Sequence, residues 1–214
     1  MMLGARTAAW SGKSLPYDAE VEYLESTRMQ WIDTAVLNAT KVQFSVWHNT
    51  SADIKLFGNS YMMGNWADIS YYRNQYRESG IEEALETWDI VILEKEPQRH
   101  LTVIRGDEKF TASRWFAANN TTNTNNSKYG TAVPLFGHTN EAGIWFGENR
   151  ITTSDIALSL RISSFKAWEN DTLIRDFIPV LDRDMRPAMY DRVTGKLFYN
   201  KGTGEFVIGP DKTT

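Results

Sequence analysis

The C-terminal part of the chain, from Leu158 to Gly209, is a series of short segments in which apolar and polar residues alternate. Residues suited to tight turns separate these segments, namely Asn170-Asp171, Thr194-Gly195 and Gly202-Thr203-Gly204. Alternation with a period of two, interrupted by Gly, Asn and Asp, is typical of antiparallel hairpins. This stretch therefore predicts consecutive β-hairpins, and it contains no cluster of reactive residues of the kind that an enzyme would need.

The same alternation occurs earlier, where Val42, Phe44 and Val46 fall on one face of a strand expected at 42–47. The chain has 214 residues, of which 42% are hydrophobic, and it includes 8 Trp, 9 Tyr and 10 Phe, a composition that favours pleated sheets with a substantial core. No linker divides it. We expect an N-terminal arm over 1–16 and a single all-β sandwich domain over 17–214, built of two antiparallel sheets with minimal helix.

Two local features are expected within this domain. Residues 80–88 form the only helix candidate, because Ile81, Leu85 and Trp88 fall on one helical face. The segment is barely two turns long, so we expect a connector rather than a major element. A turn is expected at Glu25-Ser26-Thr27, between strands predicted at 19–24 and 31–36.

Segments at both ends of the chain resemble a known family. They are VEYLEST (21–27), QWIDT (30–34), RDFIPV (175–180) and MYDRVTGKLFYNKGTGEF (189–206). Together they resemble the laminin-G-like modules of the concanavalin A-like superfamily, in the short versions found in gut bacteria and their phages. The resemblance implies a jelly-roll sandwich. It also implies binding of glycans or proteins, sometimes with calcium, or a scaffold role in surface assemblies.

Charge and composition argue against several classes of partner. The net charge is −4, and Lys and Arg are dispersed, so we expect no nucleic-acid binding. No apolar run reaches the roughly 18 residues of a membrane-spanning helix, and residues 1–12 contain no apolar stretch of signal-peptide length. The absence of cysteine excludes disulfides and thiolate metal sites.

Catalytic and metal sites are not indicated either. The acidic residues between Glu82 and Glu94 lack the paired spacing of sandwich glycosidases, and the solvated face of a short helix explains them better. His48, His100 and His138 are far apart in the sequence. Asp182-Arg183-Asp184 is similar to the start of a calcium loop but lacks its Gly and final Glu. We therefore expect no enzyme and no cofactor, and we assign no calcium ligands.

Aromatic residues give the one positive signal for a site. Trp66 and Tyr72 lie in an aromatic-rich stretch with Arg73 beside them, and Trp115 precedes an Asn-rich tract at 117–130. Sugars stack on aromatic rings while polar side chains bond their hydroxyls, so Trp66, Tyr72, Arg73 and Trp115 are predicted to bind a ligand. The alternative is that most of these rings fill the core.

Two functions remain open from the sequence. The first is a non-catalytic recognition module that binds carbohydrate through surface aromatic and polar residues. The second is a structural or decoration protein of a phage virion or bacterial cell surface, attached through the arm at 1–16. The partner is a glycan or a surface protein, and an extracellular surface or a virion is the favoured location.

Overall fold

A computed structural model describes most of the regions predicted as strands. The described residues are 14–27, 29–36, 39–49, 55–57, 71–72, 81–82, 84–94, 100–113, 134–140, 143–145 and 159–212. These residues are all-β, with no helix among them and therefore none that could cross a membrane. The prediction of an all-β fold of antiparallel sheets is confirmed.

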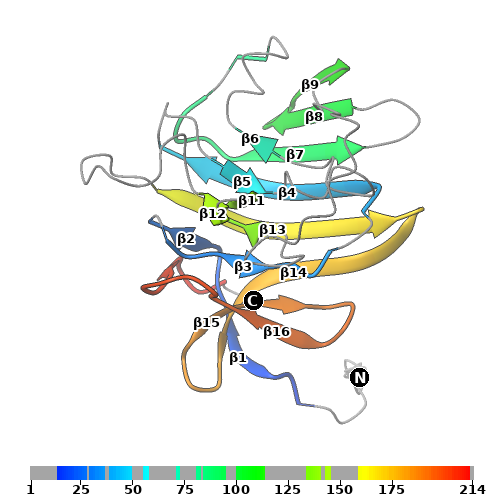
Figure 1. The fold of residues 1–214 in the computed structure, drawn as a ribbon. Coiled ribbons are helices and arrows are strands. Elements are labelled where there is room, and N and C mark those ends of the chain that lie inside the picture. The colour runs from blue at the N-terminus through cyan, green and yellow to red at the C-terminus, as the bar shows by residue number, and fades with distance from the viewer. Residues whose placement is uncertain are drawn as a thin grey trace, which may run out of the picture.

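The strands are numbered in chain order, as labelled in Figure 1. Their bounds are β1 (Tyr17–Glu20), β2 (Leu24–Ser26), β3 (Ile32–Asp33), β4 (Lys41–His48), β5 (Lys55–Phe57), β6 (Tyr71–Tyr72), β7 (Asp89–Glu94), β8 (His100–Arg105), β9 (Glu108–Ser113), β10 (Pro134–Leu135), β11 (His138–Asn140), β12 (Gly143–Trp145), β13 (Leu160–Glu169), β14 (Thr172–Asp182), β15 (Pro187–Asp191), β16 (Lys196–Tyr199) and β17 (Val207–Ile208).

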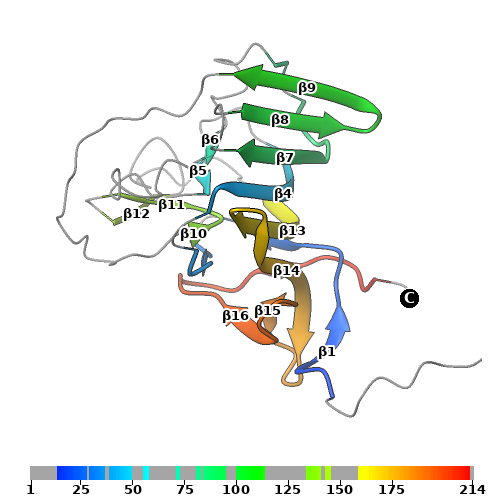
Figure 2. The ribbon, with the colours of Figure 1, turned by 90° about the vertical axis from the view of Figure 1, so that its right-hand side faces the viewer.

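One large sheet dominates the described structure. Its strands run in the order β16-β15-β14-β13-β4-β7-β8-β9, while β1 pairs with β14 and β2 pairs with both β13 and β17. A smaller sheet, β3-β10-β5-β6, and the β11-β12 ribbon lie on one side of the large sheet (Figure 2). Two stacked antiparallel sheets are consistent with the expected β-sandwich. We call the face of the large sheet turned away from the small sheet the outer face.

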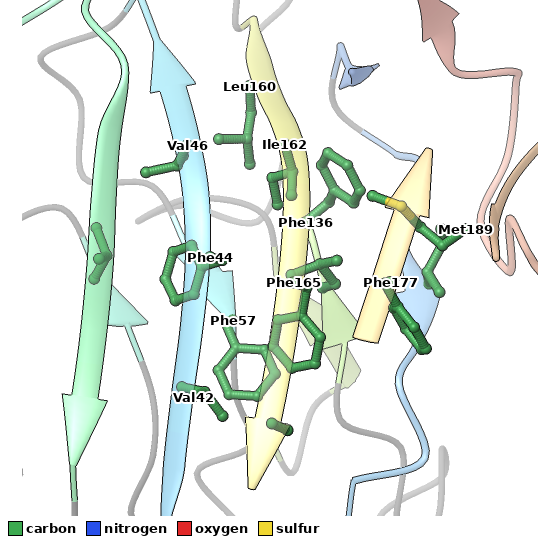
Figure 3. Close-up of a cluster of buried hydrophobic side chains, with 14 of the residues drawn as sticks. Val42, Phe44, Val46, Phe57, Phe136, Leu160, Ile162, Phe165, Phe177 and Met189 are labelled. Carbon is green, nitrogen blue, oxygen red and sulfur yellow. The ribbon is translucent and has the colours of Figure 1, made fainter. Parts of the chain in front are cut away.

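The core lies between the two sheets and is centred on phenylalanine rings (Figure 3). Phe165 on β13 is directly paired with Phe44 on β4 and with Phe177 on β14. Phe57 of the small sheet contacts both Phe44 and Phe165, with ring centroids 6.3 and 5.2 Å apart. Tilted ring pairs at such distances stabilise a core beyond the area that they bury. The expected alternation of β4 is confirmed, since Val42, Phe44 and Val46 are all buried.

The turns show where the sequence predictions hold and where they fail. Asn170 and Asp171 have φ of 46° and 66° and join β13 to β14, which confirms this hairpin turn. Gly195, with φ of 71°, lies in the turn between β15 and β16, as expected. The predicted turn at 25–27 is wrong, because Glu25 and Ser26 belong to β2 and pair with β13. Pairing with a distant strand overrides local turn preference here.

The helix candidate at 80–88 is a connector without helix in the residues that the structure describes. Glu86 has φ of 56°, which a right-handed helix does not allow, and its N–H donates to the carbonyl of His48 at 2.8 Å. The Arg105 guanidinium bonds the Glu82 carbonyl at 3.0 Å. These long-range bonds to β4 and β8 take the place of the bonds that a short helix would have made.

The segments that carry the family resemblance hold the two ends of the chain together. The Gln30 side chain donates to the Thr203 carbonyl at 3.0 Å, and Asn200 accepts from the Trp31 N–H at 3.2 Å. A side chain at Gly202 would collide with the Met29 carbonyl, so this contact requires glycine. Where these contacts join the two ends of the chain, β2 lies between β13 and β17.

Asp182 closes the turn between β14 and β15. Its carboxylate accepts hydrogen bonds from the N–H groups of Asp184 and Arg186, from Arg186 Nε and from the Tyr199 hydroxyl, all at 2.8–2.9 Å. Burial alone would raise the pKa of Asp182, but the bonds from Arg186 and Tyr199 outweigh it and lower the pKa to about 2. The stretch 182–184, which is similar to a calcium loop, is thus a turn whose first carboxylate is occupied by protein donors.

The Asp182 bonds predict a specific acid sensitivity. Because its pKa is about 2 in the fold and 3.8 ordinarily, the carboxylate stabilises the protein above about pH 4, and this contribution is lost as the pH falls towards 2. Asp182→Asn should lower the Tm at pH 7 and flatten its decline between about pH 4 and pH 2. Asp184→Asn, whose side chain is 78% exposed, is the matched control and should follow the wild type. Thermal unfolding followed by circular dichroism measures both, and an unchanged pH slope in Asp182→Asn would contradict this role.

Candidate functional site

Most of the site predicted from the sequence lies outside the described residues. This applies to Trp66, Arg73 and Trp115. Tyr72 is placed only by its backbone, which pairs with Lys55 across β5 and β6. Its side chain is outside the described part. These four residues therefore stay a prediction.

The structure brings a different group of side chains together on the outer face. It consists of Tyr23, Glu25, Trp47, Trp88 and Arg161, and we call it the outer-face cluster. Strand alternation explains its position, since Trp47 follows the buried Val46 and Arg161 precedes the buried Ile162. Arg161 pairs across the sheet with Trp47 on one side and with Glu25 on the other. The three residues therefore form one row across β2, β13 and β4.

Arg161 is the centre of this cluster. Its Nε donates to Glu25 Oε2 at 2.6 Å, and its guanidinium carbon lies 4.0 Å from the Trp47 ring centroid and 4.7 Å from that of Tyr23. A guanidinium over an aromatic ring gains about 0.5–2 kcal/mol, depending on how far it is desolvated. The side chains of Arg161 and Glu25 are 29% and 12% exposed. The charged group is therefore fixed in one orientation at the surface.

Tyr23 and Trp88 extend the aromatic surface around Arg161. Their ring centroids are 6.0 Å apart at an interplanar angle of 48°. The Tyr23 ring packs directly on the backbone of Gly209, where an added Cβ would lie 2.8 Å from a ring carbon. Trp88 is 37% exposed, so solvent and solutes reach its ring. The absence of a side chain at Gly209 therefore leaves the space that the tyrosine ring occupies.

The segment that carries Trp88 is held from both sides. On one side, the Glu86 N–H bonds the His48 carbonyl at the end of β4. On the other, Asp89 forms a two-point ion pair with Arg105, with Nε and Nη2 donating at 2.8 and 2.9 Å. Two-point pairs of this kind fix orientation as well as adding energy. The backbone that carries the exposed Trp88 is thus held in place by bonds on both sides.

The cluster offers groups suited to binding. In the part of the chain that the structure describes, Nε is the only nitrogen of Arg161 that donates to a protein acceptor, which leaves both Nη groups as donors. Glu25 Oε1 likewise has no protein donor among the described residues. The outer-face cluster therefore combines an exposed ring, N–H donors and a carboxylate oxygen.

A second aromatic group on the outer face has a structural role. Tyr17 and Tyr190 pack at 4.9 Å over the buried Ile178 and Val180. Burial raises the pKa of the Tyr17 hydroxyl, which donates to Glu20 at 2.8 Å. These rings cover a small apolar cluster and are accounted for by packing.

Metal binding finds no support in the described residues, where no three His, Cys, Asp or Glu side chains are grouped to hold an ion.

Comparison with known proteins provides no relative: no family model, curated protein or solved structure matches the chain. The resemblance of its end segments to laminin-G-like modules therefore stays a prediction.

The sequence contained part of the signal for the outer-face cluster. Trp47 is an odd number of positions away from Val42, Phe44 and Val46 in the sequence. Because side chains alternate along a strand, it must point away from the core that these three residues enter. Its partner Arg161 is 114 positions away along the chain, and only the register of β4 against β13 brings them together. Local aromatic density instead favours the stretch around Trp66 and Tyr72.

The exposure of Trp88 can be tested by stability measurements. Trp88→Ala should change the free energy of unfolding by no more than about 1 kcal/mol, because the ring is already partly in water. Phe165→Ala is the core control and should cost about 3–5 kcal/mol, because its ring is fully buried. Urea denaturation measures both. If Trp88→Ala were as costly as Phe165→Ala, the ring would belong to the core and the cluster would be closed to ligands.

Proposed function

We propose that this chain is a non-catalytic recognition module that binds carbohydrate at the outer-face cluster. The observation that carries the proposal is the exposed Trp88 ring, which packs against Tyr23, while Tyr23 in turn contacts the fixed Arg161–Glu25 pair. Sugar rings present C–H faces that stack on aromatic side chains and hydroxyls that bond nearby polar groups. The cluster combines both kinds of contact on a rigid sheet. Rigid elements reduce the entropy lost when a ligand binds.

The arrangement of the sheets supports this proposal at the level of the fold class. The stacked antiparallel sheets are compatible with the laminin-G-like, concanavalin A-like jelly roll that the end segments resemble. In this proposal Tyr23 and Glu25, which belong to the first of those segments, contact the ligand. Gln30 and Arg175, which belong to two other resemblance segments, instead bond the Thr203 and Thr34 carbonyls and so hold distant parts of the chain together. An extracellular surface or a virion is the location that suits such a module.

A structural or decoration role is the second candidate, and it rests on contacts at the turn between β14 and β15. Ser14 and Leu15 accept hydrogen bonds from Arg183 at 2.7 and 3.1 Å, next to Met185, which is 61% exposed. The arm therefore reaches the domain at the β14–β15 turn.

If the arm attaches the protein to an assembly, removing residues 1–13 should change the oligomeric state measured by light scattering.

A glycan array tests the carbohydrate proposal. The labelled wild-type chain should bind a subset of immobilised glycans, and Trp88→Ala should weaken that binding about fivefold or more, the effect of losing about 1 kcal/mol of stacking. Trp168→Ala is a matched control. Trp168 lies on β13, as Arg161 does, with the Lys41 ammonium 5.5 Å from its ring centroid, but at the far end of the strand.

Binding by Trp168→Ala should equal that of the wild type. Absence of binding to every glycan on the array would refute the carbohydrate proposal and leave the structural role. Equal weakening by both tryptophan variants would place the site elsewhere.

A further inference from the structure

The charge of Arg161 is balanced within the outer-face cluster itself. Glu25 accepts from Arg161 Nε at 2.6 Å, and its side chain is only 12% exposed, so the ion pair is shielded on one side by the protein. An incoming carboxylate or sulfate would therefore meet an arginine whose charge is already offset by Glu25. This ion pair weakens the attraction of the cluster for an anion.

The hydrogen-bonding groups that remain are complementary to hydroxyls. The two Nη groups of Arg161 donate, while Glu25 Oε1 accepts, and within the described chain neither has a protein partner. A hydroxyl group can donate and accept at the same time. Two adjacent hydroxyls on a sugar ring can thus bond to the arginine and the carboxylate together. A carboxylate on the ligand could use only the donors.

The rings of Trp47 and Tyr23 hold the arginine in place for this purpose. Guanidinium-to-ring distances of 4.0 and 4.7 Å leave the side chain little rotational freedom. Because the donors are already oriented, less entropy is lost when a ligand binds. Trp88 then supplies the exposed ring on which the sugar lies.

We infer that the outer-face cluster selects neutral sugars with adjacent hydroxyl groups over acidic sugars, and that Glu25 is the residue that determines this selectivity. The inference rests on the proposed function and specifies its ligand class. Glu25 acts in two ways: it accepts from a ligand hydroxyl and it cancels the charge of Arg161.

The test uses pairs of immobilised sugars that differ only in a carboxylate, such as glucosides with glucuronides and galactosides with galacturonides. The full wild-type chain should bind the neutral member of a pair at least about fivefold more tightly, which corresponds to about 1 kcal/mol. Glu25→Gln keeps an oxygen that can accept from Arg161 Nε but removes the negative charge. It should bind the acidic member more tightly than the wild type does, and added salt should reduce this gain.

Two further variants keep the result interpretable. Glu94→Gln removes the same charge from the Lys41–Glu94 pair, which is 2.8 Å long and lies on the same face of the sheet. It should leave the neutral-to-acidic ratio unchanged. Arg161→Lys keeps the positive charge without the paired Nη donors, so neutral sugars should bind about fivefold less tightly. This variant remains informative if Glu25→Gln fails to fold.

The outcomes separate the inference from the function on which it depends. A wild-type preference for the acidic members, or an unchanged ratio in folded Glu25→Gln, would overturn the inference while carbohydrate binding stood. Equal changes in the neutral-to-acidic binding ratio in Glu25→Gln and Glu94→Gln would also overturn it. The net charge of the protein, rather than the position of the Glu25 carboxylate, would then determine the selectivity. Absence of binding to either member of every pair would refute the proposed function itself.

Discussion

The packing of phenylalanine rings between the two sheets determines how the rest of the molecule is arranged. Phe44, Phe165 and Phe177 occupy one row across three neighbouring strands, and Phe57 reaches this row from the small sheet. Because side chains alternate along a strand, burial of this row directs the intervening residues to the outer face. A slip of one residue in β4 would bury Trp47 and expose the phenylalanine. Core packing therefore fixes the position of the candidate site.

The site also depends on the pairing of chain segments that are far apart in sequence. Glu25 on β2 is paired with Arg161 on one side and with Val207 on the other. The bonds of Gln30 and Asn200 hold β2 in that place. The end segments thus serve architecture first, and through it they bring Tyr23 and Glu25 to the arginine. Folding and recognition share these residues.

The sequence predicted much of the architecture because alternation and turn residues are local signals. Local residue pattern alone predicts the turn at Asn170-Asp171 and the inward face of β4. The helical periodicity at 80–88 does not produce a helix in the described residues, where long-range hydrogen bonds to β4 and β8 hold the segment instead. The outer-face cluster was missed for a related reason: the Arg161–Glu25 contact spans 136 positions, and no local pattern specifies the strand register that creates it.

The most direct test of the account is nuclear magnetic resonance of the chain with labelled tryptophan indole and arginine Nε groups. Signals are assigned by single Trp→Phe and Arg→Lys variants, and neutral oligosaccharides of glucose, galactose and mannose are then titrated in. A sugar that binds at the outer-face cluster should shift the signals of Trp47, Trp88 and Arg161 and leave that of Trp168 in place. Shifts confined to Trp66 or Trp115, with the outer-face cluster unchanged, would contradict it.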